Sequence, residues 1–211
     1  QSLFAHIPGM KVVMPVTAYD AKGLLLASFE EKCPVIFIEH RWLHKEKSEV
    51  PENFYTEPIG KARIVREGAD ITIVGISHMV LEALKAAKEL KKNNIGVEVI
   101  DLRTLRPWDK ETVLASVKKT GRLVVADTGW LSCSIGSEIV ATAAEEAFEF
   151  FKAPAKRIGV AETPAPSSYK LEEYFYPDVN DIITAVTQIM DQGDLKLKFE
   201  KDTSKRFTGS F

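Results

Sequence analysis

The stretch that decides the fold spans residues 97–130 and reads VEVIDLRTLRPWDKETVLASVKKTGRLVVADTGW. Its apolar run up to Asp101 and Leu102 predicts a buried strand, which is followed by a loop containing arginine and proline. A short helix and a second strand ending at Asp127–Trp130 complete the pattern. Strand, helix and strand in this order predict one compact βαβ unit, which we interpret as a scaffold for docking rather than as an active site.

The same alternation extends over most of the chain. Because strands alternate with helices at short spacing, we expect an α/β fold with a doubly wound, mostly parallel sheet. The expected strands cover residues 62–65, 71–76, 97–102, 123–126 and 158–161, and the expected helices cover residues 79–90, 135–151 and about 182–189.

A smaller unit precedes this sheet. Residues 12–16 and 34–38 read as two strands, joined by a helix that Thr17 caps and Asp20 follows. Two strands and one helix bury too little apolar surface to be stable alone. We therefore expect a partial α/β domain over residues 1–40, a linker over 41–59 and a second domain over 60–190.

The tail, residues 191–211, has too little apolar surface to fold independently. Within it Leu195, Leu197 and Phe199 alternate with lysines, so a short edge strand or a clasp on a partner is a possible role.

Composition excludes several classes of protein. The 211 residues are 45% hydrophobic and 27% charged, with a net charge of −2, so no basic field favours nucleic acid. The apolar runs are too short for a membrane span, and we expect the cytoplasm, or the mitochondrial matrix in a eukaryote. Cys33 and Cys133 have no metal-ligand spacing and read as reduced packing thiols.

Four blocks in the same order make the chain similar to a known family. The sequence resembles the C-terminal half of the beta subunit of thiamine-diphosphate-dependent 2-oxoacid dehydrogenases, the pyruvate and branched-chain type, within the transketolase superfamily. The blocks are FAHIPGMKVVMP from Phe4, YDAKGL from Tyr19, PVIFIEH from Pro34 and the stretch from Asp101 to Trp130. This resemblance implies a partial pyrimidine-binding domain followed by a complete transketolase-type C-terminal domain.

The resemblance also implies a function that the chain shares with other subunits. The intact enzyme decarboxylates a 2-oxoacid and transfers the acyl group to a lipoyl group. The family's activating glutamate and its His-Ser-Gln segment would lie upstream of Gln1. We therefore assign no catalytic residue to this chain and expect it to be inactive alone. Thiamine diphosphate and magnesium are expected to need a separate alpha subunit.

Further partners follow from the same resemblance. They are a second beta subunit and the subunit-binding domain of the acyltransferase core, a basic module that the acidic residues Glu145, Glu146 and Glu149 would suit. Two alternatives remain open at this point. One is the corresponding half of a transketolase or a deoxyxylulose-phosphate synthase, and the other is a free-standing interaction module that binds an anion at Ser77.

Two candidate ligand sites lie in the first 40 residues, of which the second follows from the resemblance. His6, before Pro8, is a candidate to reach the cofactor, although such a histidine often caps a turn. A potassium ion is implied at the end of the first long helix, where main-chain carbonyls and one acidic side chain are ligands in relatives. An ordinary exposed helix end is the alternative. The potassium positions are Ser28, Phe29, Glu31 and Cys33, and relatives often carry aspartate and asparagine where Glu31 and Cys33 stand.

Other polar residues read as structural. Ser77 is interpreted as a helix N-cap, with an anion site as the alternative. His40 and His44 lack a third ligand for zinc, and a solvated loop is favoured over a subunit contact. Two further groups complete these expectations: an ion-pair network of Asp101, Arg103 and Arg106, and an interface formed by Asp127 and Trp130.

Overall fold

The computed structural model describes residues 1–191 and residue 199, and its larger sheet has five strands. Four strands run parallel and one edge strand, β3, runs antiparallel to its neighbour. The prediction of a doubly wound, mostly parallel sheet is therefore confirmed. The strands lie in the order β3 (Arg63–Arg66), β5 (Val97–Asp101), β4 (Ile71–Gly75), β7 (Leu123–Trp130) and β8 (Lys156–Val160).

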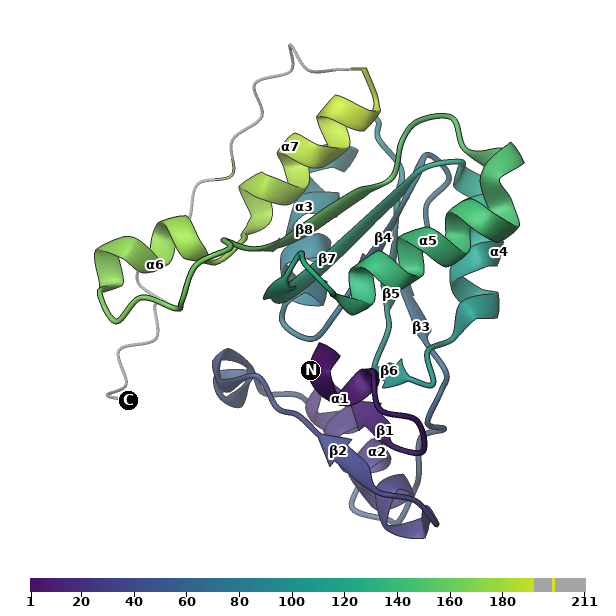
Figure 1. Cartoon of the computed structure of the whole chain (residues 1–211), viewed down its shortest axis with the longest axis vertical. Helices are drawn as coiled ribbons and strands as arrows, with labels where there is room; N and C mark the ends of the chain where they lie inside the picture. Colours follow the sequence, from purple (N-terminus) through teal and green to yellow (C-terminus); the bar gives the residue numbers. More distant parts are fainter. Residues whose placement is uncertain (192–198, 200–211) are drawn as a thin grey trace.

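Helices cover both faces of this sheet (Figure 1). α3 (Met79–Lys91) packs against α7 (Val179–Ile189) on one face, and α4 (Lys110–Thr120) packs against α5 (Ile135–Ala147) on the other. Each face encloses its own apolar cluster, the first built largely from α3, α7 and the strands and the second from α4, α5 and the strands. The strands are apolar on both faces because both faces are covered.

Local signals fix where the helices begin and end. Asp109 accepts a hydrogen bond from the backbone N–H of Thr112 and begins α4, which ends at Gly121 in a left-handed conformation that favours glycine. α5 ends at Ala147, and the single turn η2 (Phe148–Phe150) follows it. The helix predicted over residues 135–151 is thus shorter than expected. α6 (Tyr169–Phe175), which projects from the body in Figure 1, was not predicted.

A second, three-stranded sheet lies at the opposite end of the molecule (Figure 1). β1 (Lys11–Val13) pairs parallel with β2 (Val35–Phe37), and α2 (Ala18–Glu30) joins them as predicted. The third strand, β6 (Thr104–Arg106), pairs antiparallel with β1. The prediction of a loop at this position was wrong, since these residues leave the large sheet and complete the small one. The short helix α1 (Ser2–Ala5) precedes β1.

The segment predicted as a linker is held against α2. After the single turn η1 (Arg41–Lys45), residues 46–59, hereafter the crossing segment, run along α2, and the Tyr55 hydroxyl donates to the carbonyl of Tyr19 at 2.8 Å. The backbone N–H of Glu57 donates to the carbonyl of Gly23 at 3.1 Å. A Cβ on Gly23 would lie 2.7 Å from the Glu57 side chain, so this close approach requires glycine.

Within the described part of the chain, we find no helix with the length and apolar character needed to cross a bilayer. The tail positions Leu195 and Leu197 lie outside the described residues.

Candidate functional site

The two sheets meet around a buried carboxylate, Asp20. It lies in the first turn of α2, where Thr17 Oγ1 accepts from the Asp20 backbone N–H and donates to its Oδ2. Two arginines from the second half of the chain reach the same carboxylate. Arg63 Nη2 lies 2.6 Å from Asp20 Oδ2, and Arg103 Nη1 lies 3.0 Å from Oδ1. Because the Asp20 side chain is fully buried, each charge here depends on its partners.

Arg103 connects three parts of the chain. Its Nη1 also lies 2.7 Å from Glu57 Oε2, and its Nε donates to the carbonyl of Lys61 at 3.0 Å. The side chain is only 5% exposed. Burial lowers the Arg103 pKa, but the hydrogen bonds that Arg103 donates to Glu57 and Asp20 outweigh it and raise this pKa above its ordinary value, so the guanidinium stays charged. Asp20, Glu57, Arg63 and Arg103, hereafter the Asp20 cluster, join α2, the crossing segment and both sheets.

Asp101 lies beside the Asp20 cluster at the end of β5. Its Oδ1 accepts from the backbone N–H of Arg103, while its buried Oδ2 has no hydrogen-bond partner. Burial, followed by the charge of Asp20, raises its pKa to about 7. The predicted ion-pair network of Asp101, Arg103 and Arg106 is thus wrong in its partners. Arg103 pairs with Asp20 and Glu57, and Arg106 donates to the carbonyl of Ala5 at 3.2 Å.

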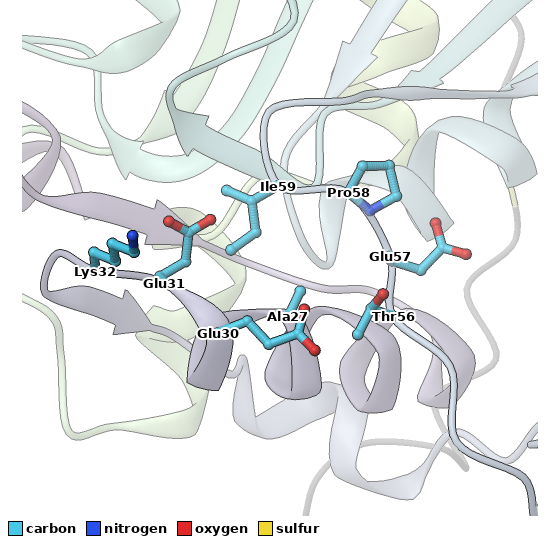
Figure 2. Close-up of a pocket in the computed structure, with 8 residues that line it drawn as sticks. All are labelled: Ala27, Glu30, Glu31, Lys32, Thr56, Glu57, Pro58 and Ile59. Atoms are coloured by element: carbon cyan, nitrogen blue, oxygen red, sulfur yellow. The ribbon is translucent and has the colours of Figure 1, made fainter.

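An open hollow of about 520 Å³ lies next to the Asp20 cluster, between the last turns of α2 and the crossing segment (Figure 2). In Figure 2 the Ile59 side chain faces Glu31 across the hollow, and the Glu57 carboxylate points away from it. That carboxylate accepts from Arg103 Nη1. The lining residues are Ala27, Glu30, Glu31, Lys32, Thr56, Glu57, Pro58 and Ile59.

The positions expected to hold potassium lie at the same helix end. Ser28 Oγ donates to the carbonyl of Leu24, and the Phe29 side chain is 80% exposed. Glu31 forms an ion pair of 2.5 Å with Lys11. A cation that used the Glu31 carboxylate would therefore meet a lysine that already neutralises it. Cys33 is half-buried and lines a second, smaller hollow.

The cofactor candidate His6 is exposed at the end of α1, where its backbone N–H bonds to Ser2. Of the two residues expected at an interface, Asp127 is buried and accepts from Gln1 Nε2 at 2.9 Å. Burial raises the Asp127 pKa. Trp130 is 52% exposed and donates to the carbonyl of Thr163. Only Trp130 therefore presents a large apolar surface to a partner.

An aromatic cluster covers the start of α3. The rings of His40 and His78 stack at 5.3 Å, and Trp42 meets His78 and Tyr176 edge-on at 5.0 Å. The expectation of a solvated loop is wrong for His40, whose Nδ1 accepts from the backbone N–H of Trp42 and begins η1. The expectation of a solvated loop agrees better with His44, because the His44 side chain remains exposed near Glu39.

The prediction that Ser77 caps α3 is wrong. His78 occupies the N-cap position, and Ser77 has a left-handed backbone with φ of 52°. Its buried hydroxyl has no hydrogen-bond partner.

Sequence reasoning missed the roles of Asp20, Glu57 and Arg63. Asp20 was interpreted only as part of a helix start, and Glu57 only as part of a linker. Their partners are 43 to 83 residues away along the chain, a separation that no local pattern reports. The one available signal was a carboxylate in the first turn of the helix expected between the first two strands, since a charge that such a helix buries needs a partner.

Two family profiles match this chain. The profile described as "Transketolase, C-terminal domain" matches residues 60–182, which is more than half of the sequence. The chain belongs to the transketolase family. A second profile of the family, "Transketolase, pyrimidine binding domain", matches residues 1–46. The resemblance stated from the sequence is thereby confirmed.

Curated relatives in the transketolase family include beta subunits. The chain is 46% identical over 191 residues to subunit beta of the acetoin:2,6-dichlorophenolindophenol oxidoreductase of Cupriavidus necator, covering 90% of this chain and 56% of that one. It is 46% identical over 187 residues to the pyruvate dehydrogenase E1 component subunit beta of Rhizobium meliloti, covering 88% and 41%. The chain thus spans about half the length of the curated relatives that it matches.

A solved structure shares the arrangement. A protein titled "Split gene transketolase, inactive beta4 tetramer" superposes with a TM-score of 0.73 and 28% identity, covering 91% of this chain and 61% of that one. The identity to dehydrogenase beta subunits is higher than to this transketolase, which favours the dehydrogenase interpretation.

Proposed function

We propose that this chain forms part of the beta subunit of a thiamine-diphosphate-dependent 2-oxoacid dehydrogenase. The observation that carries the proposal is an identity of 41–46% to pyruvate dehydrogenase E1 beta subunits over 86–88% of the chain. In the complete enzyme a 2-oxoacid loses carbon dioxide, and its acyl group and two electrons pass to a lipoyl disulfide. This chain contributes assembly surfaces and does not catalyse the reaction alone. We place it in the cytoplasm or the mitochondrial matrix.

Acetoin is a second candidate substrate for the complete enzyme. The specific observation is the 46% identity to the beta subunit of the acetoin-oxidising enzyme of Cupriavidus necator. Acetoin cleavage and 2-oxoacid decarboxylation both use the carbanion chemistry that thiamine diphosphate supplies when bound.

We assign magnesium and the cofactor's diphosphate to an alpha subunit. Among residues 1–191 and 199, no group of three histidine, cysteine or acidic side chains is arranged to hold a metal ion. The family relation implies thiamine diphosphate itself. We retain His6 as a candidate contact to it, because this exposed side chain lies free to approach a second subunit.

Potassium binding at Ser28, Phe29, Glu31 and Cys33 is part of the same proposal. It is supported by the position of these residues at the end of α2, where carbonyl oxygens carry partial negative charge. The expected result is a melting temperature that is higher in potassium chloride than in choline chloride at equal ionic strength. Equal melting temperatures in the two salts would remove the potassium assignment.

The proposed partners are an alpha subunit, a second beta subunit and the acyltransferase core. Two exposed surfaces support docking to them. One is the acidic surface formed by the end of α5 and the turn η2, where Glu145 and Glu149 are exposed and Glu146 pairs with Lys110. The other is α6, where Leu171 is 55% and Tyr174 84% exposed.

Reconstitution tests the proposal. We expect the chain alone to release no carbon dioxide from pyruvate, and to bind an alpha subunit of a pyruvate dehydrogenase on a sizing column. The complete set is then assembled from this chain, the alpha subunit and the upstream half of a beta subunit. Turnover is measured as carbon dioxide released from pyruvate and as acetaldehyde released from acetoin. Turnover by the chain alone contradicts the inactive role, and absence of any complex with the alpha subunit contradicts the assembly role.

A further inference from the structure

Asn180, in the first turn of α7, binds both backbone groups of one residue near the C-terminus. Its Oδ1 accepts from the N–H of Phe199 at 2.8 Å, and its Nδ2 donates to the carbonyl of Phe199 at 3.3 Å. A carboxamide presents a donor and an acceptor side by side, which matches an extended backbone. We propose that Asn180 and the apolar surface beside it form a peptide-recognition site, which the chain's own Phe199 occupies.

The first turn of α7 holds Asn180 in place. The N–H of Asn180 donates to Asp178 Oδ1 at 2.6 Å, and the N–H of Asp178 donates to Asp181 Oδ2 at 2.8 Å. The Asp178 side chain also accepts from the backbone N–H of Asp181, so Asp178 and Asp181 form a capping box that fixes the backbone at the start of the helix. Because its own backbone is fixed, the Asn180 carboxamide loses little freedom when it binds a peptide.

The Phe199 side chain supplies selectivity. It is half-buried and packs against the apolar cluster that α3 and α7 share. The backbone hydrogen bonds can form with any residue other than proline, whereas the apolar surface that contacts the side chain selects among residues. The site therefore fits an extended segment that carries an aromatic residue.

The observed occupant, Phe199, belongs to the same chain, and this favours it over a peptide from another protein. Asn180 and Phe199 are 19 positions apart, so Phe199 reaches the site as an intramolecular ligand. Short connections of this kind give effective concentrations in the millimolar range. A peptide from another protein that binds with equal affinity must be present above this effective concentration to displace Phe199. The site is therefore closed in cis under ordinary conditions.

Trypsin cleavage after Lys198 tests the contact directly. Trypsin cuts the peptide bond between Lys198 and Phe199, and the N–H of that bond donates to Asn180 Oδ1. The contact between Asn180 and Phe199 must therefore open before cleavage. Asn180→Asp keeps one acceptor and replaces the donor by a second oxygen that repels the Phe199 carbonyl. An acidic residue in the first turn of a helix favours folding. We expect cleavage of this variant about three to ten times faster, as the loss of one hydrogen bond predicts.

The matched control is Asn53→Asp, which makes the same change at an exposed asparagine whose side-chain amide donates to the carbonyl of its neighbour Phe54. Its cleavage rate should equal that of the natural chain. Equal rates for the Asn180→Asp variant and the natural chain would overturn the proposal.

Binding of a peptide in trans tests the recognition site itself. The probe is a synthetic peptide with the sequence of residues 194–204. We expect it to bind the Phe199→Ala chain, in which no aromatic side chain covers the apolar surface, and to bind the natural chain at least about tenfold more weakly. Adding Asn180→Asp to the Phe199→Ala chain should weaken binding about fivefold. Equal binding of a peptide with alanine in place of Phe199, or no binding to the Phe199→Ala chain, contradicts the inference. None of these results depends on the dehydrogenase assignment.

Discussion

Burial raises the pKa of Asp101 to about 7, so the protonation of this one carboxyl group changes the free energy of unfolding with pH. In the unfolded chain an aspartate ionises near pH 4, whereas folded Asp101 keeps its proton until about pH 7. The folded state therefore binds the extra proton, and the contribution of Asp101 to the free energy of unfolding falls as pH rises from about 4 to 7. Asp101→Asn imitates the protonated acid and should remove this fall, which amounts to at most about 4 kcal/mol.

Urea unfolding at pH 4.5 to 8 measures the effect. The Asp101→Asn chain should be more stable than the natural chain at pH 8, with the difference shrinking toward pH 4.5. Asp191→Asn, at an exposed aspartate, is the control and should run parallel to the natural chain. A natural chain whose stability rises between pH 5 and 7 as steeply as that of the variant would contradict a protonated Asp101.

At this scale the sequence predicted local contacts and missed distant ones. The Thr17 cap was predicted because the hydroxyl and the backbone that it binds lie three residues apart. Arg103 was expected to act on its own loop, but its ion pairs are with Asp20 and Glu57. Those pairs depend on which elements the fold brings together, and the sequence pattern carries no such information.

Among the elements, α2 contains a glycine where packing outweighs helix propensity. Alanine normally stabilises a helix interior by about 1 kcal/mol relative to glycine. At Gly23, however, a Cβ would lie 2.7 Å from Glu57 Cγ and 2.9 Å from Tyr55 Cε2. We expect Gly23→Ala to lower the free energy of unfolding by about 1–3 kcal/mol, because the crossing segment must move away from α2.

Gly136→Ala in α5 is the matched control. A Cβ there would meet its nearest neighbour, Val125 Cγ1, at an ordinary 3.4 Å, so the variant should be unchanged or slightly more stable. Thermal melting of both variants compares them, and equal melting temperatures would show that the crossing segment is not held against α2.

The aromatic cluster between η1 and α3 gives an element-level dependence on pH. Burial lowers the pKa of His40 and of His78 to about 4. Unfolded histidine titrates near pH 6.5, so the unfolded state binds more protons between pH 6.5 and 4. The contribution of these two histidines to stability is therefore full above pH 6.5 and decreases as pH falls toward 4. His78→Phe keeps a ring against Trp42 and should reduce that decrease.

The control for this change is His6→Phe, which removes an exposed histidine. The readout is the free energy of unfolding in urea at pH 4.5, 5.5, 6.5 and 7.5. If His78→Phe and His6→Phe lose stability with acid to the same extent, the buried cluster is not the cause.

Periodicity predicted the long elements and failed for the short ones. α3, β4 and β5 follow clear apolar patterns, since many residues report the same period. β6 has three residues next to a proline, which reads as a loop in any local window. α6 has seven residues and few buried ones, so its pattern was equally weak.

On the scale of the whole molecule, the two sheets share chain segments. β6 follows β5 directly, yet it completes the small sheet by pairing with β1. At the same junction Arg103 binds Asp20 on α2 and Glu57 on the crossing segment. Neither sheet can open at this junction without breaking a strand pair and buried ion pairs.

This sharing predicts that both sheets unfold in one transition, which Arg103→Met tests. Removing the guanidinium leaves Asp20 and Glu57 without their shared partner, and breaking a buried pair costs about 3–5 kcal/mol. Far-ultraviolet circular dichroism and tryptophan fluorescence should give coincident urea transitions in the natural chain. In Arg103→Met the transition should move to lower urea.

Asp20→Asn in the Arg103→Met background separates an unpaired charge from lost packing. With the buried charge on Asp20 also removed, the double variant should be more stable than the sum of the two single losses. Additive losses would mean that the two side chains do not interact. Separate transitions in the natural chain would mean that the small sheet folds and unfolds independently, because β6 would then not bind the two sheets into one cooperative unit.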